Sequence, residues 1–395
     1  MTPASLPTAR PADIGLSEDA LRRLSTAFTR EIASKRLPGM VALLARRDRV
    51  GFVESLGVRD PKSGAAMTPE SIFRIYSMTK TIVSVATMML LEEGRLLLGD
   101  PLSKFLPAFA KPKVAVETGG SVELVPAARE ITIQDLLRHT SGLVYEFRGT
   151  GPVYQRYVEA NISRRDQTNA DHAATLATMP LNFHPGTRWE YSRSTDVLGR
   201  VLEVIEGKPL GTVLTERVLR PLGMVDTGFH VPASELHRVA QAFDKDPDTG
   251  EVVTLLDPRE PPMFQSGGGG LFSTAQDVAR FALMLLNGGA LDGVRLLGPK
   301  TVEFMTADHL GSIPGVEVMT GPGFGFGLGF AVRLADGLAT SPGSAGLYYW
   351  GGIAGTVFWV DPREDLVAIL LTQAPGQREY YRSLFRNLVY ASLAE

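Results

Sequence analysis

The sequence predicts an α+β fold in which both ends of the chain contribute strands to one antiparallel sheet flanked by helices. Strand patterns occur before residue 60 and again after about residue 322, whereas helical patterns dominate the middle of the chain. The length and composition agree with such a fold, because 395 residues with 44% hydrophobic content are enough for a large core. We therefore expect the middle of the chain to be a mostly helical insertion.

The first ninety or so residues predict a helix, a hairpin and a second helix. Residues 17–35 repeat apolar side chains at helical spacing, and Ser17 is a typical N-cap residue. Apolar runs at 40–45 and 50–56 predict two strands, which a short charged turn joins into a hairpin. Residues 81–91 carry no charge and are rich in Ile, Val, Met and Leu, which predicts a buried helix.

The later elements follow from the same patterns. Helical segments of the middle region are predicted at 133–137, 175–179, 194–205 and 210–219. After four consecutive glycines at 267–270, a helix capped by Ser273 or Thr274 is expected to run to Leu286. Three strands are then predicted at 326–334, 356–360 and 366–372, and a last helix at 378–393.

Together these elements predict two domains. Residues 1–95 and 266–395 are expected to form an α/β domain around the central sheet. Residues 96–265, with their helices and Pro- and Gly-rich loops, are expected to form the inserted domain. The active site is then expected in the cleft between the two.

Composition excludes several classes of protein. The formal net charge of −3 gives neither a basic surface nor an acidic tail, so no nucleic-acid partner is expected. The chain has no cysteine, which excludes disulfides and thiolate chemistry. No apolar stretch is long enough to cross a membrane, and the first fifteen residues lack a signal-like apolar region. We expect a cytoplasmic protein without a membrane partner; the oligomeric state is left open.

Ser77 and Lys80 lie at the start of the predicted buried helix, in the motif Ser-Met-Thr-Lys. Residues three apart share one face of a helix, so these side chains are expected to meet at its N-terminal end. The free N–H groups and the positive dipole end found there favour developing negative charge. A hydroxyl beside an amine in such a place suits a serine nucleophile with a lysine partner. Since a Ser-x-x-Lys pattern also arises by chance in a chain this long, its meaning depends on the other parts of a site.

The histidines do not indicate a catalytic base. None of the six has metal-site spacing and no Gly-x-Ser-x-Gly motif occurs, which disfavours a zinc enzyme and an α/β-hydrolase. No metal or cofactor is expected, and His139 and His184 lie in loop-like segments where structural hydrogen bonding is expected. A tyrosine, whose free pKa is near 10, can act as a base when a nearby cation makes its proton labile. Tyr191, just before an amphipathic helix, is one candidate among ten tyrosines.

Six motifs in a fixed order add a family resemblance over nearly the whole chain. They are FRIYSMTK at 73–80, LLRHTSGL at 136–143, FHPG at 183–186 followed by Tyr191-Ser192, PLGMVDT at 221–227, SGGGGL at 266–271 and WGG at 350–352. In these motifs the chain resembles the serine β-lactamase and DD-peptidase superfamily, most closely the family VIII carboxylesterases. The resemblance implies a fold like that of class C β-lactamases.

The resemblance also implies the catalytic roles. Ser77 matches the nucleophile and Lys80 its proton-relay partner. Tyr191 matches the tyrosine of the family's Tyr-x-Asn motif, which is the expected general base. Whether Lys80 or Tyr191 is the base is left open, because the two groups would titrate as a coupled pair.

Further roles are implied at a strand that edges the site. Trp350, Gly351 and Gly352 stand where penicillin-recognising members of the superfamily have Lys-Thr-Gly. The oxyanion hole of the family consists of two backbone N–H groups. By position these belong to Ser77 and Ile353.

Two departures from the family pattern concern the substrate. Arg193 replaces the Asn of Tyr-x-Asn, which contacts the amide of β-lactams and peptides. Trp350 replaces the Lys of Lys-Thr-Gly, and an indole offers a flat apolar wall where the lysine holds a carboxylate. Both changes favour neutral esters with an apolar part. Aromatic residues suggest a roomy apolar pocket at the mouth, namely Tyr145, Phe324, Tyr348 and Tyr349.

The sequence thus predicts a serine carboxylesterase that hydrolyses small neutral esters through an acyl-Ser77 intermediate. Three alternatives stay open. One is a β-lactamase or a D-amino-acid-directed peptidase or amidase with the same site, and another is an acyltransferase that uses the same acyl-enzyme. The third is a binding or scaffold protein without activity, against which the joint presence of Ser77, Lys80 and Tyr191 argues.

Overall fold

A computed structural model of the chain describes residues 5–118 and 121–394. In these ranges the main sheet has eight strands in the order β10-β11-β12-β13-β14-β1-β2-β3, and each strand is antiparallel to its neighbours. Their bounds are β1 Gly39–Arg46, β2 Arg49–Asp60, β3 Ala65–Ala66, β10 Phe324–Phe326, β11 Ala331–Arg333, β12 Tyr348–Gly351, β13 Val357–Asp361 and β14 Leu366–Thr372. The two ends of the chain meet at the β1–β14 pair, which runs from Met40 opposite Thr372 to Arg46 opposite Leu366.

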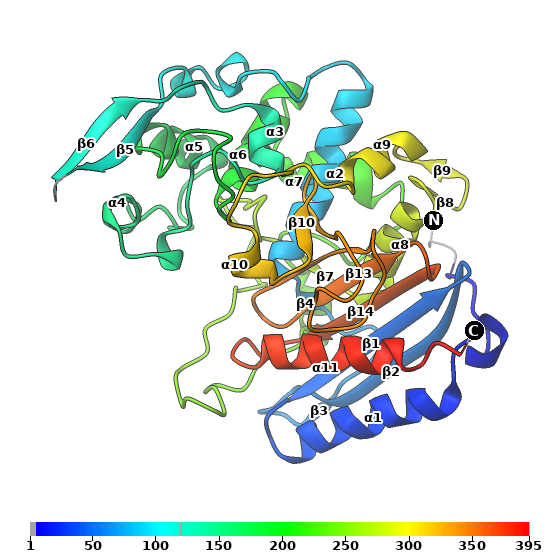
Figure 1. Cartoon of the computed structure of the whole chain (residues 1–395). Helices are drawn as coiled ribbons and strands as arrows, with labels where there is room; N and C mark the ends of the chain where they lie inside the picture. Colours follow the sequence, from blue (N-terminus) through cyan, green and yellow to red (C-terminus); the bar gives the residue numbers. More distant parts are fainter. Residues whose placement is uncertain (1–4, 119–120, 395) are drawn as a thin grey trace.

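The sheet is the middle of three layers, because both of its faces are covered by helices (Figure 1). Alternate residues of a strand point to opposite faces. Met40, Ala42 and Leu44 of β1 pack in a core with α1 (Glu18–Ala33) and α11 (Arg378–Tyr390). Val41 and Leu43 pack on the other face, in the core that contains α8 (Ala275–Leu286) and α2 (Thr79–Glu92).

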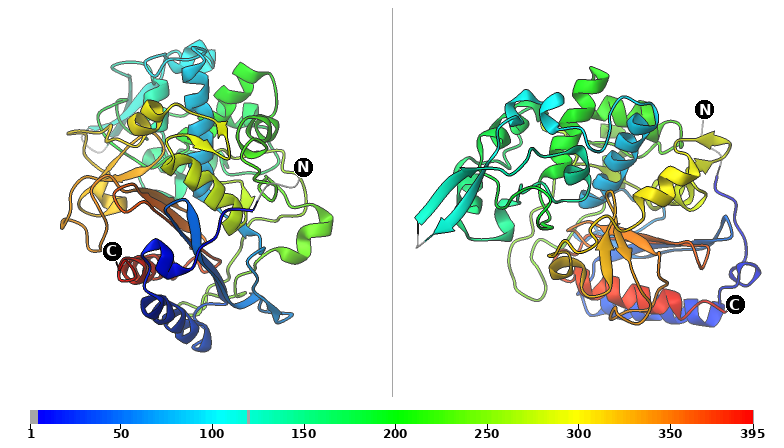
Figure 2. Two further views of the ribbon diagram at one scale, coloured as in Figure 1. Left: turned by 90° about the vertical axis from the view of Figure 1, so that its right-hand side faces the viewer. Right: turned by 45° about the horizontal axis from the view of Figure 1, so that its top comes forward.

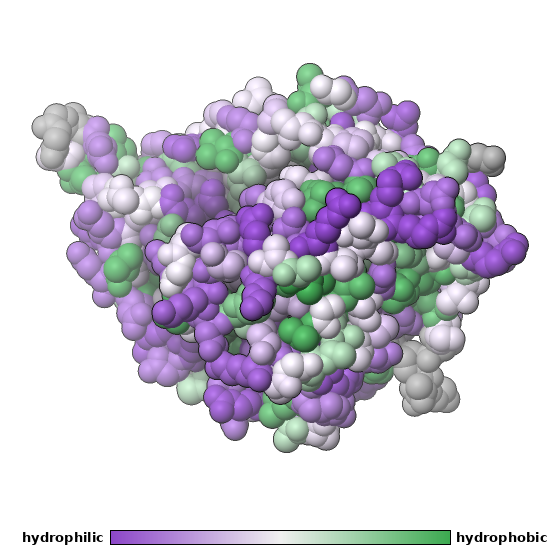
Figure 3. Space-filling model, turned by 90° about the horizontal axis from the view of Figure 1, so that it is seen from below, coloured by the Kyte–Doolittle hydropathy of each residue, from purple (hydrophilic) through white to green (hydrophobic). Residues whose placement is uncertain are grey.

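The outer helices α1 and α11 present one apolar and one polar side. Leu21, Leu24 and Phe28 of α1 are buried, and the Ser17 side chain caps the helix by accepting a hydrogen bond from the Ala20 N–H. Seen from the side of these helices, the surface carries hydrophobic residues only in small groups among hydrophilic ones (Figure 3). This pattern is typical of helices that cover a sheet on one side and face water on the other.

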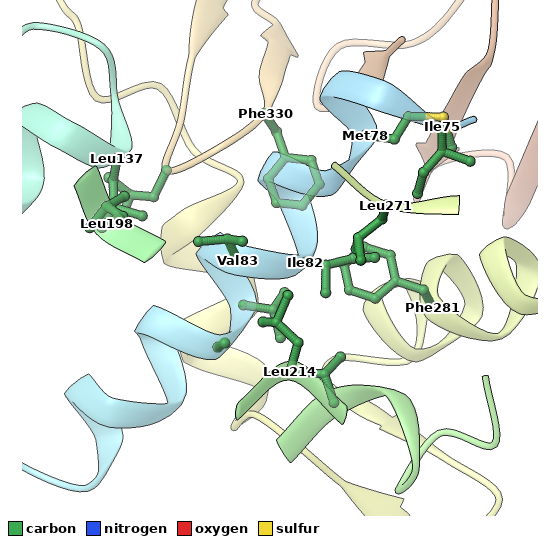
Figure 4. Packing of buried hydrophobic residues seen from close by; sticks show 14 of the residues in the cluster. Ile75, Met78, Ile82, Val83, Leu137, Leu198, Leu214, Leu271, Phe281 and Phe330 are labelled. Atoms are coloured by element: carbon green, nitrogen blue, oxygen red, sulfur yellow. The ribbon is translucent and has the colours of Figure 1, made fainter. Parts of the chain in front are cut away.

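Helix α2, which follows the Ser-x-x-Lys motif, is the central helix of the molecule. Nearly all of its residues are buried, including the threonines and Lys80. Its apolar side chains meet residues of α3, α6, α7 and α8, as the close-up of Ile82, Val83 and their neighbours shows (Figure 4). A helix that is buried on all sides is held rigidly, so it is a firm support for the motif at its N-terminus.

The middle region lies on the α2 side of the sheet, and its regular elements are mainly helices joined by long loops (Figure 2). Its helices are α3 Ile133–Leu137, α4 Pro152–Glu159, α5 Asn169–Thr178, α6 Ser194–Glu206 and α7 Leu210–Leu214. A hairpin, β5 (Lys113–Thr118) with β6 (Ser121–Pro126), projects from it and was not predicted. Most residues of β6 are exposed, so the hairpin lacks the apolar pattern that would identify it in the sequence.

Short elements complete the chain. The short strands are β4 Phe73–Arg74, β7 Phe272–Ser273, β8 Ala290–Leu291 and β9 Val294–Arg295, and the remaining α-helices are α9 Pro299–Met305 and α10 Glu317–Thr320. The 3₁₀-helices are η1 Pro11–Ile14, η2 Tyr76–Met78, η3 Leu102–Lys104, η4 Pro107–Phe109, η5 Glu146–Arg148 and η7 Ala233–Arg238, and η6 Thr215–Leu219 is a short π-helix. No helix in the described ranges is both long and apolar enough to cross a membrane.

The predicted fold class is confirmed, with an antiparallel sheet from both ends of the chain and a mostly helical region between. The predicted strand 326–334 is wrong in detail, since it is two strands, β10 and β11, joined by a turn in which Gly329 has a φ of +100°. No apolar pattern predicted β12, although the family resemblance implied a strand at Trp350–Gly352. Of the two expected caps of α8, Thr274 is the one that caps it. The domain boundaries near residues 95 and 265 stay a prediction.

Asp277, in the first turn of α8, makes stability depend on pH. Burial raises its pKa from 3.8 to about 6, although its carboxylate accepts hydrogen bonds from the Asp226 N–H and the Thr227 hydroxyl. Between about pH 4 and 6 the folded chain therefore holds a proton that the unfolded chain has released, and the free energy of unfolding falls as pH rises. A shift of two pKa units corresponds to about 3 kcal/mol. We expect Asp277→Asn to remove this decline in urea titrations; parallel pH profiles for both proteins would contradict the assignment.

Candidate active site

A strained turn presents Ser77. Strand β4 pairs with β7 immediately before the motif, and the Ile75 N–H donates to the Leu271 carbonyl. Tyr76 then adopts a φ of +43°, which is rare for a bulky residue, and its hydroxyl accepts a hydrogen bond from the Leu256 N–H. Such strain is held in place only by surrounding contacts and is common at functional sites. The turn leaves Ser77 half-buried at the N-terminal end of α2.

The Lys80 ammonium group lies beside Ser77 and contacts groups from three other segments. Its Nζ lies 3.5 Å from the Ser77 Oγ and donates to the Tyr145 hydroxyl at 3.0 Å and to the Gly268 carbonyl. The same Nζ lies 4.5 Å from the centre of the Tyr191 ring. Lys80 is 1% exposed, so this cation acts in a region that excludes water.

Tyr191 and Trp350 come from different elements and meet beside Lys80. The Trp350 Nε1–H donates to the Tyr191 hydroxyl at 3.3 Å, and their ring centres are 5.2 Å apart. Trp350 lies on β12, opposite Phe358 of β13, whereas Tyr191 lies just before α6. Both side chains are buried, so the sheet and the helical region each contribute one wall of the site.

Tyr145 was predicted to line the substrate pocket, but its side chain is buried beside Lys80 and Tyr191. Its hydroxyl contacts Lys80, and its ring lies 5.3 Å from the Tyr191 ring. Burial raises the pKa of Tyr145 well above its ordinary value, and the nearby charge of Asp196 adds to this. Tyr145 is therefore a neutral phenol under ordinary conditions. Its ring also stacks on Phe147, which is exposed at the surface.

Arg193 is buried in an ion-pair network instead of standing free beside Ser77. Its guanidinium pairs with Glu146, lies 3.7 Å from an Asp196 oxygen and lies over the Tyr145 ring. Asp196 in turn accepts hydrogen bonds from the Gly268 N–H and the Ser266 hydroxyl. The network thus connects Arg193 to the glycine-rich loop whose carbonyl receives the Lys80 ammonium. Direct contact between Arg193 and a substrate stays a prediction.

The expected oxyanion donors lie on facing segments. Among the described residues, neither the Ser77 N–H nor the Ile353 N–H donates a hydrogen bond. The segment after β12 packs closely on the motif turn, and the Thr356 hydroxyl donates to the Ile75 carbonyl at 3.4 Å. Ile353 is exposed at the end of that segment. The segment that carries Ile353 is therefore packed against the turn before Ser77, and the joint role of the two N–H groups stays a prediction.

Gly352→Ala should damage this arrangement. A Cβ at Gly352 would lie 2.4 Å from the Ile75 carbonyl oxygen and 2.4 Å from the Thr356 Oγ1, so the two segments would have to separate. We expect the rate of any reaction that forms an oxyanion at this place to fall ~100-fold, as for loss of one oxyanion donor. The control is Gly99→Ala, whose Cβ would meet nothing within 4 Å. Equal turnover by the two variants would contradict this close packing.

The two histidines in the motif loops have structural partners, as predicted. The His139 ring packs at a tilt against the Tyr191 ring and its Nδ1 pairs with the Ser192 hydroxyl, while burial lowers the pKa of His139 well below 6.5. His184 accepts a hydrogen bond from the Ala128 N–H. The described part of the chain contains no group of three His, Cys, Asp or Glu side chains that could hold a metal ion.

The other aromatic residues expected at the mouth pack mostly against the cores of the sheet. Tyr348 is buried against Phe330 in the core on the α2 side of the sheet. Phe324 and Tyr349 pack against each other and belong to or border the core on the α11 side. The expectation that they line the pocket is wrong for Tyr348 and Phe324, whose side chains point into the two cores. Tyr349 also packs against the cluster of Tyr145, Tyr191 and Trp350, so its place at the mouth stays a prediction.

Comparison with known proteins places this site in a family. A family model described as Beta-lactamase matches residues 24–391. The chain belongs to the beta-lactamase family. Esterase EstB of Burkholderia gladioli is 34% identical over 415 residues, which cover 99% of this chain and 100% of that protein. Protein Rv1367c of Mycobacterium tuberculosis (strain ATCC 25618 / H37Rv) is 38% identical over 347 residues, which cover 85% of this chain and 86% of that protein.

A solved structure supports the same family assignment. EstCE1, a hydrolase with promiscuous acyltransferase activity, is 28% identical and superposes with a TM-score of 0.80 over 94% of this chain and 99% of its own. With the family model and the EstB match, this confirms the predicted place in the serine β-lactamase superfamily, in its family VIII esterase branch.

Several contributors to the site of this beta-lactamase family member were not predicted from the sequence. They are the Tyr145 hydroxyl, Glu146, Asp196 and the Gly268 carbonyl. One signal for Asp196 exists in the sequence: it follows Arg193 by three residues, a spacing that brings opposite charges together on a helix. The other contacts join segments far apart in the chain and have no local signal.

Proposed function

We propose that this protein is a serine carboxylesterase that hydrolyses small neutral carboxylic esters through an acyl-Ser77 intermediate. The observation that carries the proposal is the meeting of Ser77, Lys80 and Tyr191, with Trp350 hydrogen-bonded to the tyrosine. The full-length similarity to Esterase EstB supports the same activity. No cofactor takes part, because the nucleophile, base and oxyanion donors all come from the chain.

In the acylation step, Tyr191 takes the proton of the Ser77 hydroxyl and the serine oxygen attacks the ester carbonyl. Two nearby groups favour negative charge on the tyrosine oxygen: the Lys80 ammonium beside its ring and the Trp350 N–H on its hydroxyl. Tyr145 serves as the neutral partner that holds Lys80, since its raised pKa makes it unsuited to be the base. The alcohol leaves with the proton returned from Tyr191.

The N–H groups of Ser77 and Ile353 stabilise the oxyanion that forms on the ester carbonyl. Each such donor contributes on the order of 3 kcal/mol to the barrier in comparable sites. Water then attacks the acyl-enzyme by the same route, with Tyr191 and Lys80 again handling the proton. Hydrolysis releases the acid and restores the Ser77 hydroxyl.

The proposed preference for neutral esters rests on Trp350 and Arg193. Trp350, Gly351 and Gly352 offer an indole and a bare backbone edge, with no cation for a substrate carboxylate. The Arg193 guanidinium is engaged by Glu146 and Asp196. A neutral ester with an apolar part therefore suits this site better than an anionic β-lactam.

Transfer of the acyl group to an alcohol or amine is a second candidate. The structural relative EstCE1 is described as a hydrolase with promiscuous acyltransferase activity, and an exposed Ile353 leaves the acyl-enzyme open to acceptors other than water. Product analysis with added alcohol separates transfer from hydrolysis. The cytoplasmic location is also a proposal, which fractionation of cells tests.

The test of the esterase proposal is a panel of p-nitrophenyl esters of increasing acyl length, with nitrocefin as the β-lactam. We expect turnover of the esters and at most slow turnover of nitrocefin. A fluorophosphonate should label Ser77, which mass spectrometry of the peptide detects. Efficient nitrocefin hydrolysis without ester hydrolysis would favour the β-lactamase alternative, and absence of both turnover and labelling would favour a scaffold.

A further inference from the structure

We propose that Arg382, on the last helix, is a positioning residue for the oxyanion hole. Its guanidinium fixes and polarises the peptide group whose N–H is that of Ile353. The inference deepens the proposed function and rests on it, because the peptide matters only if an oxyanion forms at Ser77.

Arg382 reaches from α11 to the end of β12. Its Nη2 donates to the Gly352 carbonyl at 2.5 Å and to the Thr356 carbonyl at 3.0 Å, while Nη1 pairs with Glu379 at 2.9 Å. A Cβ at Gly351 would lie 2.7 Å from Nη2 and 2.9 Å from Cζ. Glycine at that position is therefore what allows the guanidinium to reach the backbone.

The carbonyl that Arg382 holds belongs to the same peptide unit as the proposed oxyanion donor. In a trans peptide, the Gly352 C=O and the Ile353 N–H point in opposite directions. Helix α11 lies on one face of the sheet, and α2, which begins beside Ser77, lies on the other (Figure 1). A carbonyl fixed toward α11 therefore directs the N–H toward the side of Ser77.

The charge of Arg382 adds to this orientation. A cation on the carbonyl oxygen draws electron density through the planar peptide and makes its N–H a stronger donor. Only 20% of the Arg382 side chain is exposed, so water screens the charge weakly. Burial lowers the pKa of Arg382 from 12.5, yet arginine remains charged in proteins.

The test compares Arg382→Gln and Arg382→Lys with wild type in ester hydrolysis. We expect Arg382→Gln to lower kcat about 10- to 100-fold with little change in KM, and Arg382→Lys to recover part of the loss because it keeps the cation. The matched control is Arg378→Gln, one turn earlier on α11, whose guanidinium contacts the same Glu379. It should leave kcat unchanged.

A second readout separates this role from simple stabilisation. A trifluoromethyl ketone, which forms a charged adduct with serine, should bind Arg382→Gln more weakly by the same factor as the loss in kcat. The corresponding alcohol, which forms no oxyanion, should bind equally to both proteins. Thermal unfolding is recorded for each variant, and if Arg382→Gln does not fold, Arg382→Lys carries the same two comparisons.

Three results would overturn the role of Arg382 and leave the proposed esterase function standing. They are a kcat of Arg382→Gln within twofold of wild type, a loss equal to that of Arg378→Gln, or equal weakening of ketone and alcohol. If wild type cleaves no ester, the proposed function fails, and the rate of Ser77 labelling by a fluorophosphonate then tests Arg382. A labelling rate that the Arg382→Gln change leaves unaltered would overturn the role of Arg382 as well.

Discussion

Replacing Ser77 by alanine should lower kcat/KM for p-nitrophenyl esters by about 10⁵-fold, since no other group in the site can carry the acyl intermediate. The serine lies on a turn held by β4, β7 and the strained Tyr76 backbone, so removal of one oxygen should leave the fold unchanged. Steady-state hydrolysis and the mass shift with a fluorophosphonate are the measurements. Both signals should disappear together.

The matched control is Ser84→Ala. Ser84 is a buried serine on α2, two turns beyond Ser77 and one turn beyond Lys80. We expect the Ser84 variant to keep the wild-type rate and label. Turnover by Ser77→Ala above about one thousandth of wild type, after purification away from host esterases, would exclude Ser77 as the nucleophile.

Lys80→Met should lower kcat/KM about 10³- to 10⁴-fold. Methionine keeps an unbranched side chain of similar length but removes the cation that lies 3.5 Å from the Ser77 oxygen and beside the Tyr191 ring. Without this charge, neither the serine proton nor the tyrosine proton becomes labile, so acylation slows. Stopped-flow measurement of the p-nitrophenol burst reports acylation directly.

The control for Lys80→Met must separate chemistry from stability, because Lys80 is 1% exposed and its loss leaves the Gly268 carbonyl without its ammonium partner. Tyr145→Phe removes the other hydrogen bond of that ammonium and keeps the charge. We expect it to cost about 10-fold in rate, far less than Lys80→Met. Similar losses in the two variants, at equal thermal stability, would assign Lys80 a structural role instead.

The fold could be predicted from the sequence where local patterns are strong. The helix after Ser17 has clear apolar periodicity, whereas the β1–β2 hairpin and the buried helix after Ser77 follow from apolar runs. All were predicted in the right place, although β2 continues to Asp60, beyond its predicted end at residue 56. The apolar pattern did not indicate strand β12, because this strand is four residues long and one of the four is glycine. Its most informative residue, Trp350, was found through motif resemblance rather than through a strand pattern.

The site was predictable only in part, for a physical reason. Ser77 and Lys80 are neighbours on one helix, so their meeting follows from helical spacing. The contacts of Lys80 with Tyr145 and Gly268, and of Arg193 with Glu146, join residues tens to hundreds of positions apart. Such contacts depend on the packing of the whole chain, which no local pattern records.

The pairing of β1 with β14 affects how the chain folds during its synthesis. Residues 40–46 cannot complete their sheet until residues 366–372 have been synthesised, so the fold is dominated by contacts distant in sequence and should form slowly. Trp350 and Ile353 likewise emerge from the ribosome long after Ser77 and Lys80. A nascent chain in which Ser77 has left the ribosome therefore still lacks the segment with the proposed second oxyanion donor. We expect activity to appear in a single late step, when the last helix packs on the sheet.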